Sequence, residues 1–259
     1  MGTRRSAGSD AFTLAKLIRP RLFEVVAQHM ETDMYSDRLT DWLSSVHQLS
    51  TDLGHGLISP LQWQEGMDAI YGNVPLQRLL LEIKFDRLAA EMLDMPLETK
   101  GEIFRDIPLR TLPEHDPRRG SEPSNVLITK VAHVKRDRCI PPHGHGSMVS
   151  AFLCLSGEFH VRLFDRVDDL GGKMTIRQTA DDPHARTGSW SSVSDYRDNV
   201  HWLTAKTDDC FLLTMKLIRV ETHKQYNSRI YLDLDLARHL GSGALLVPKI
   251  SGDEARAKY

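Results

Sequence analysis

The chain has 259 residues, of which 41% are apolar and 26% are charged, and its formal net charge is -2. This balance is typical of a globular protein with a substantial core and excludes disordered and fibrous classes. The near-neutral charge and the scattered basic residues also argue against nucleic acid as a partner.

The compartment is indicated by the cysteines and by the apolar runs. Cys139, Cys154 and Cys210 are too few and too dispersed for a disulfide framework, and none forms a CxxC pair. No apolar run is long enough to span a bilayer, and the first ten residues lack the apolar segment of a secretory signal. We therefore expect a cytoplasmic protein that does not bind membranes.

The first 105 residues have helical spacing. Apolar side chains recur at intervals of three and four residues, which predicts one buried stripe of a helix, at Leu39, Trp42, Leu43, Val46 and Leu49. Ser59, Pro60 and Gln62 follow the order of a capping box, so a second helix should begin there. A further helix is predicted from Pro75 towards Met92. We expect these helices to form a layer packed on the rest of the chain.

The pattern changes after a proline-rich and charged segment at 112–120, which is predicted to be a linker. Short runs rich in β-branched and aromatic residues follow, at 126–134, 148–155, 159–164, 174–177 and 211–220. Strands at this spacing favour a mainly β double-sheet jelly roll. The predicted organisation is a helical region at 1–105, a β-barrel at 106–235 and a C-terminal tail at 236–259.

The most informative segment contains His143, Gly144 and His145. Alternate side chains of an extended chain share a face, so the two imidazoles point the same way, and Gly144 is expected to give the backbone room to approach an ion. Two imidazoles aimed at one point suit a divalent metal.

This segment resembles the first motif of the cupin superfamily, in which HxH is followed by a glutamate and, seven residues later, by a glycine in a tight turn. Gly157 is in register with that glycine, but Ser150 stands at the glutamate position. The segment Asp198 to Ala205 resembles the second cupin motif, which implies His201 as a third ligand. The resemblance implies a double-stranded β-helix with a metal held by His143, His145 and His201.

The HxH that lacks its glutamate, paired with an Asn-x-His segment, is similar to the thiol dioxygenases, most closely to the cysteamine and plant cysteine oxidase branch. That resemblance implies mononuclear Fe(II) held by three histidines. The chain departs from mammalian-type cysteine dioxygenases at 214–218, where their Ser-x-His-x-Tyr segment is replaced by Thr-Met-Lys-Leu-Ile.

Four further residues are candidates for the substrate pocket. Ser150, Phe152 and Cys154 share one frame of a strand and should face the barrel interior. Trp202 follows the third ligand and is interpreted as packing beneath the site or stacking on substrate. His160 falls in the opposite frame from Phe159 and is expected outside the barrel. No general acid or base can be assigned.

Three neutral ligands leave the full charge on the metal, which favours an anionic thiolate or enolate as the first substrate and dioxygen as the second. The leading hypothesis is oxidation of a small thiol to a sulfinate, and one alternative is cleavage of a diketone or enol. A second alternative is an isomerase, lyase or hydrolase that uses Zn, Mn or Ni. A third is a ligand-sensing cupin whose helices bind a partner or form a homodimer.

Overall fold

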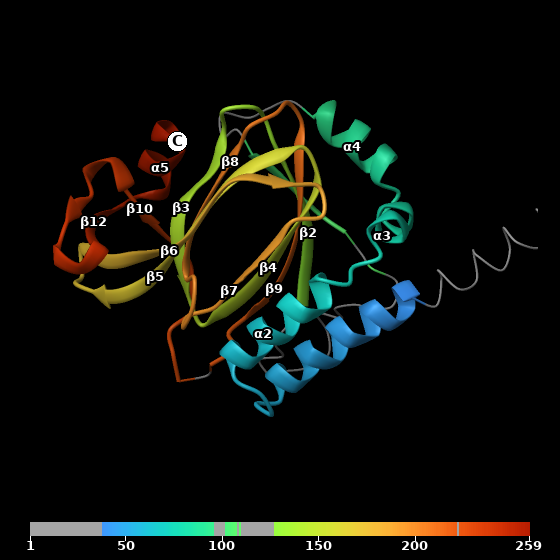
Figure 1. The fold of residues 1–259 in the computed structure, drawn as a ribbon, viewed down its shortest axis with the longest axis horizontal. Helices are drawn as coiled ribbons and strands as arrows, with labels where there is room; N and C mark the ends of the chain where they lie inside the picture. The colour runs from blue at the N-terminus through green and yellow to red at the C-terminus, as the bar shows by residue number, and fades with distance from the viewer. Residues whose placement is uncertain (1–37, 96–101, 108, 110–126, 222) are drawn as a thin grey trace, which may run out of the picture.

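The computed structural model describes residues 38–95, 102–107, 109, 127–221 and 223–259. Two β-sheets pack face to face, and helices from the N-terminal part of the chain cover one of them (Figure 1). The linker predicted at 112–120 lies outside the described residues. Within the ranges given above, no helix is long and apolar enough to cross a membrane.

The helices follow the predicted apolar stripe and cap. Residues 38–54 are helical and bury Leu39, Trp42, Leu43 and Val46, while Leu49 packs partly buried against the same core. Helix α2 (Pro60–Tyr71) begins at the predicted place, because the Ser59 side chain accepts from the Gln62 N–H and the Gln62 side chain accepts from the Ser59 N–H.

The helix predicted from Pro75 to Met92 is instead two helices, α3 (Leu76–Glu82) and α4 (Phe85–Leu93). The break lies at Lys84, whose φ of 50° is in the left-handed region. Ile83 and Phe85 both pack against the same core cluster. Two residues that are two apart lie on different sides of a continuous helix, so the break is what brings both side chains to the core.

The strands form two sheets. The first has the order β1-β2-β9-β4-β7, with β1 (Glu102–Asp106), β2 (Leu127–Val134), β9 (Cys210–Ile218), β4 (Met148–Ser156) and β7 (Trp190–Val193). The second has the order β10-β3-β8-β5-β6-β12-β11, with β10 (Asn227–Leu232), β3 (Cys139–Gly146), β8 (Val200–Ala205), β5 (Glu158–Asp169), β6 (Lys173–Arg186), β12 (Ala244–Ile250) and β11 (Arg238–His239). All the pairings are antiparallel.

The chain alternates between the sheets as β2, β3, β4 and β5, and then returns through β6, β7, β8 and β9. Strands β2-β9-β4-β7 therefore face strands β3-β8-β5-β6, which is the arrangement of a jelly roll. The predicted fold class is confirmed: the chain is a mainly β, cupin-like jelly roll with N-terminal helices.

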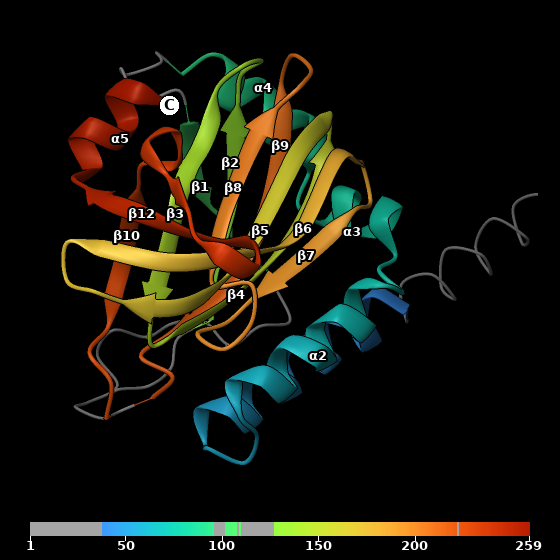
Figure 2. The same ribbon diagram turned by 60° about the vertical axis from the view of Figure 1, so that its left-hand side comes forward.

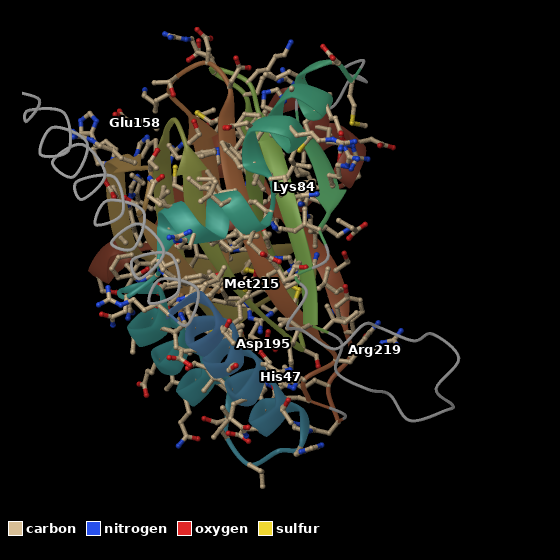
Figure 3. All side chains as sticks on the ribbon, turned by 90° about the vertical axis from the view of Figure 1, so that its right-hand side faces the viewer. His47, Lys84, Glu158, Asp195, Met215 and Arg219 are labelled. Atoms are coloured by element: carbon tan, nitrogen blue, oxygen red, sulfur yellow. The ribbon has the colours of Figure 1, made fainter. Side chains whose placement is uncertain are left out.

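The helices cover the outer face of the first sheet. Trp63 and Met67 of α2 belong to one buried cluster with Val149, Leu153 and Met215 of the sheet. Figure 3 looks onto this layer and labels Met215 of β9 among the helices. Since side chains alternate along a strand, the residues directly before and after each of these three sheet residues point into the barrel.

The residues expected to form a tail at 236–259 are part of the fold. Strand β12 pairs with β6 and β10, and Val247 packs with Ile176 and Phe164 in a third apolar cluster. Helix α5 (Gly252–Lys258) follows, with a capping box at Ser251 and Glu254. These elements lie away from α2, on the far side of the barrel (Figure 2). The boundary expected at residue 105 likewise falls inside strand β1.

Candidate metal centre

The three predicted histidines lie together inside the barrel. His143 on β3 is the direct cross-strand partner of His201 on β8, and His145 lies two residues further along β3 on the same face. One ligand atom from each residue lies within 4.8 Å of the others. The ring centroid of His143 lies 4.7 Å from that of His145 and 4.2 Å from that of His201. All three side chains are buried.

Hydrogen bonds fix the orientation of each ring. The Nδ1 atom of His143 donates to Pro141 O at 2.7 Å, that of His145 donates to Ser228 O, and that of His201 donates to Asn199 O at 3.3 Å. A carbonyl oxygen can only accept, so each Nδ1 carries the proton and each Nε2 keeps its lone pair. Partners of this kind fix the tautomer of metal-binding histidines in other proteins.

The electrostatics keep these rings neutral. Burial is the main cause that lowers the pKa of His143 and of His145 well below the usual value, and the neighbouring His201 and Arg229 lower both further. Burial also lowers the pKa of His201 to about 3. Three neutral, buried Nε2 atoms that face one another fit a divalent metal ion, because deprotonated imidazole nitrogen is a preferred ligand of such ions.

The backbone of His145 is held by side chains around it. Asn199 Nδ2 donates to His145 O at 3.2 Å, and Arg166 Nη1 donates to the same oxygen at 3.1 Å. A Cβ atom on Gly144 would lie 2.6 Å from Asn199 Oδ1. Gly144 therefore makes room for the Asn199 amide, whereas the sequence had suggested room for an ion.

The cavity at the histidines carries positive charge and lacks an acid. Its volume is about 30 Å³, and no aspartate or glutamate is among the described residues that line it. Ser150, at the cupin glutamate position, lines the cavity, and its hydroxyl donates to Met215 O at 3.4 Å. Lys216 and Arg229 also line it.

Sequence reasoning missed Thr214, Lys216 and Arg229 as site residues. Thr214 and Lys216 are two residues apart on β9, so they face the interior together, and Thr214 Oγ1 is buried without a hydrogen-bond partner among the described residues. Alternation around the buried Met215 could have indicated these two. No comparable pattern pointed to Arg229, because β10 was not predicted as a strand.

The remaining pocket candidates fall in three places. Phe152 lines the metal cavity, as expected, while Cys154 lines a separate neighbouring cavity. Trp202 does not line the cavity, so its place in the substrate pocket was wrong: its ring packs outside the barrel against Arg162, whose guanidinium carbon is 3.2 Å from the ring centroid. Adjacent residues on a strand point to opposite faces, so the residue after an inward ligand must point outward.

The two remaining expectations are confirmed. His160 lies outside the barrel, where its Nε2 is 2.5 Å from Asp181 Oδ1. Gly157 has a φ of 84° in the turn after β4. A Cβ atom there would lie 2.6 Å from Cys210 Sγ. Only glycine fits both the dihedral angle and the space.

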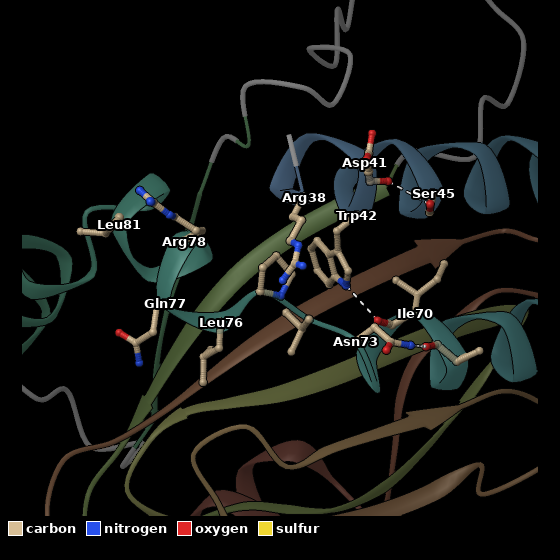
Figure 4. A pocket seen from close by; sticks show the side chains of 13 residues that line it. Arg38, Asp41, Trp42, Ser45, Ile70, Asn73, Leu76, Gln77, Arg78 and Leu81 are labelled. Carbon is tan, nitrogen blue, oxygen red and sulfur yellow. Dashed lines mark hydrogen bonds between the residues drawn. The ribbon is translucent and has the colours of Figure 1, made fainter. Parts of the chain in front are cut away.

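A much larger hollow, of about 1160 Å³, lies among the helices outside the barrel (Figure 4). Trp42 forms part of its wall and donates from Nε1 to Ile70 O at 3.0 Å. Among the described residues, none that lines this hollow also lines the metal cavity. The hollow is therefore a feature of the helical layer and not of the candidate centre.

No protein-family model matches the chain, and no curated protein matches it in sequence. Solved structures that are similar to it include KdgF from Halomonas sp., 15% identical over 48% of this chain and 84% of its own, with a TM-score of 0.31. An oxalate oxidase is 14% identical over 49% of this chain and 57% of its own, with a TM-score of 0.32. Procruciferin, an 11S globulin from Brassica napus, is 14% identical over 39% of this chain and 22% of its own, with a TM-score of 0.30.

The chain thus spans little more than half of the oxalate oxidase and about a fifth of the globulin. The strand order and the histidine cluster, taken from the chain itself, define its class: a cupin-like barrel with a candidate metal centre of three histidines.

Proposed function

We propose that the chain is an iron(II) enzyme that uses dioxygen to oxidise a small anionic thiol to a sulfinate in the cytoplasm. The observation that carries the proposal is the convergence of three neutral imidazoles in a buried cavity that no acidic side chain of the described residues lines. A coordinated carboxylate would repel an anionic substrate, and this ligand set has none.

The ligands would be the Nε2 atoms of His143, His145 and His201. When bound there, iron(II) supplies a positive charge that favours thiolate over thiol and the redox chemistry by which dioxygen adds to sulfur. The reaction balances without a further reductant: RS⁻ and O₂ give RSO₂⁻, both oxygen atoms end on sulfur, and the sulfur is oxidised while the oxygen is reduced.

The other cavity residues support a substrate with a second negative charge. Burial is the main cause that lowers the pKa of Lys216, and Arg229 lowers it further. An anion beside the ammonium would offset both effects. The unpartnered Thr214 hydroxyl is a third donor on the same wall. A carboxylate on the thiol would accept hydrogen bonds from the Lys216 ammonium and the Thr214 hydroxyl.

The test compares three small thiols that differ in the charge of the group opposite the sulfur. Metal-free protein is loaded with iron(II) without oxygen and is then given oxygen with 3-mercaptopropionate, cysteamine or 1-propanethiol, which carry a carboxylate, an ammonium or no charge. We expect oxygen uptake to be fastest with 3-mercaptopropionate, with a sulfinate product identified by mass spectrometry. Zinc-loaded protein should give no uptake.

Lys216→Met should raise KM for 3-mercaptopropionate by about ten- to a hundredfold, as for loss of a hydrogen bond to a charged group. The matched control is Lys135→Met, because Lys135 is exposed at the end of β2. Oxygen uptake only with β-dicarbonyl compounds would replace thiol oxidation by the enol reaction. Isomerisation or elimination with zinc, manganese or nickel, and none of these activities with iron, would place the chain outside oxygen chemistry.

A further inference from the structure

A second cavity occupies the barrel interior next to the metal centre. Its volume is about 130 Å³, and Phe152 is the single residue that lines both cavities among the described residues. The Phe152 ring centroid lies 5.0 Å from that of His201. The Phe152 side chain therefore separates the second cavity from the metal ligands.

The two cavities lie one after the other along the same strands. On β8 the inward residue after His201 is Leu203, and on β9 the inward residue before Thr214 is Leu212; both leucines line the second cavity. A shift of two residues along a strand is about 7 Å. The register pairs Cys154 with Leu212, as it pairs Phe152 with Thr214.

The second cavity is apolar within and polar at one end. Phe159, Leu203 and Leu212 are almost fully buried in its wall, whereas Asp182 and Trp190 are exposed. Its mouth therefore lies where the end of β6 meets the start of β7. A water needs two to four polar partners, and apolar cavities of about 150 Å³ stay dry and bind xenon.

We propose that this cavity is a binding site for dioxygen, which enters between β6 and β7 and reaches the metal centre past Phe152. Dioxygen is small, uncharged and apolar, so it fits the leucine and phenylalanine walls and gains nothing from Lys216 and Arg229. The metal cavity would then receive the anionic substrate from its charged side and the gas from its apolar side. The use of the gas rests on the proposed function, whereas the binding site rests on the cavity.

Cys154 in the wall is compatible with dioxygen. Burial is the main cause that raises the pKa of its thiol, to about 12. The thiolate is the form that oxidants attack, so this cysteine resists oxidation beside a bound gas.

The first experiment uses dissolved dioxygen as a paramagnetic probe of the zinc-loaded protein, so that no reaction is required. We expect oxygen to accelerate the relaxation of the methyl groups of Leu203 and Leu212 more than that of Leu43 and Val46. Those control residues are equally buried, at 2% and 0% exposure, but lie in the helical layer. Equal relaxation in the two groups would overturn the proposal.

Two variants add the same aromatic ring to the same strand. Ala180→Phe places it in the cavity wall, where Ala180 is half-buried, and Arg177→Phe places it on the exposed surface. Ala180→Phe should abolish the excess relaxation, and Arg177→Phe should leave it unchanged. Circular dichroism is used to check that both variants are folded. Excess relaxation that survives in a folded Ala180→Phe protein would overturn the assignment.

The iron-loaded enzyme provides an independent readout. Ala180→Phe should lower kcat/KM for dioxygen while leaving KM for the thiol unchanged. A change confined to KM for the thiol would assign the cavity to the substrate and overturn the gas site. If no thiol is oxidised at all, the relaxation experiment still decides whether dioxygen binds, so failure of the proposed function is distinguishable from failure of this inference.

Discussion

The barrel interior has two ends built from the same strands and opposite chemistry. At one end β3, β8 and β9 present His143, His201 and Lys216, and at the other end β8 and β9 present Leu203 and Leu212. Both sets point inward because side chains alternate along each strand. A step of two residues along a strand therefore changes the interior from charged and polar to apolar. The difference teaches that one jelly roll can hold a charged cavity and a mainly apolar cavity without any extra element, with Phe152 between them.

The largest expected effect tests the polar end. His201→Ala removes one candidate ligand, and we expect metal affinity to fall by more than about a hundredfold, since loss of an outer hydrogen-bond partner alone costs 10- to 100-fold. Metal content is measured by mass spectrometry after chelator competition. His160→Ala, outside the barrel, is the control and should retain metal. Full retention of metal by His201→Ala would show that the centre is elsewhere.

The next effect tests the boundary between the two ends. Phe152→Ala should destabilise the metal-free protein by about 3 to 5 kcal/mol, because a buried aromatic ring is replaced by a cavity. Urea unfolding gives the change. Leu236→Ala serves as the control, because Leu236 is 65% exposed, and its effect should stay within about 0.5 kcal/mol. A small effect at Phe152 would mean that the two cavities are not separated by a packed ring.

A fall in pH should destabilise the protein through the end of the barrel interior that holds the three histidines. The pKa of His201 is about 3 in the folded chain, below its ordinary value of 6.5, so the unfolded state binds the proton first as the pH falls. Stability of the metal-free protein is therefore complete above about pH 6.5 and is lost towards pH 3, at up to about 1.4 kcal/mol per pH unit for each such histidine. Thermal unfolding across this range measures the loss. The variant with His143, His145 and His201 all replaced by glutamine should lose less stability, and equal losses would contradict the assignment.

The smallest effect concerns the outer face of the sheet. Trp202→Leu removes the ring that stacks on Arg162 and lies 5.2 Å from the Tyr259 ring, and should cost about 1 kcal/mol of stability. We expect metal content, measured by mass spectrometry, and kcat/KM, measured by the thiol assay, to stay within about twofold of the original values. A large loss of activity without unfolding would mean that Trp202 contributes to the substrate pocket.

Local sequence patterns were enough to find much of the fold. The Leu39 to Leu49 stripe, the Ser59 cap and the Gly157 turn depend on interactions within a few residues, and each appears where predicted. The break at Lys84 was missed because it depends on which surface Ile83 and Phe85 reach, and that surface belongs to the sheet. The same holds for β12, whose partner β6 lies about seventy residues earlier in the chain.

The sequence by itself indicated the two candidate ligands of the HxH pair and, through the resemblance, the third candidate histidine, because alternation along one strand and a short motif are local properties. Only the tertiary structure decided that Lys216 and Arg229 share the cavity with them and that Trp202 does not. The reason is physical: a cavity wall is assembled from cross-strand neighbours on β3, β8, β9 and β10, and their register is set by the packing of two whole sheets.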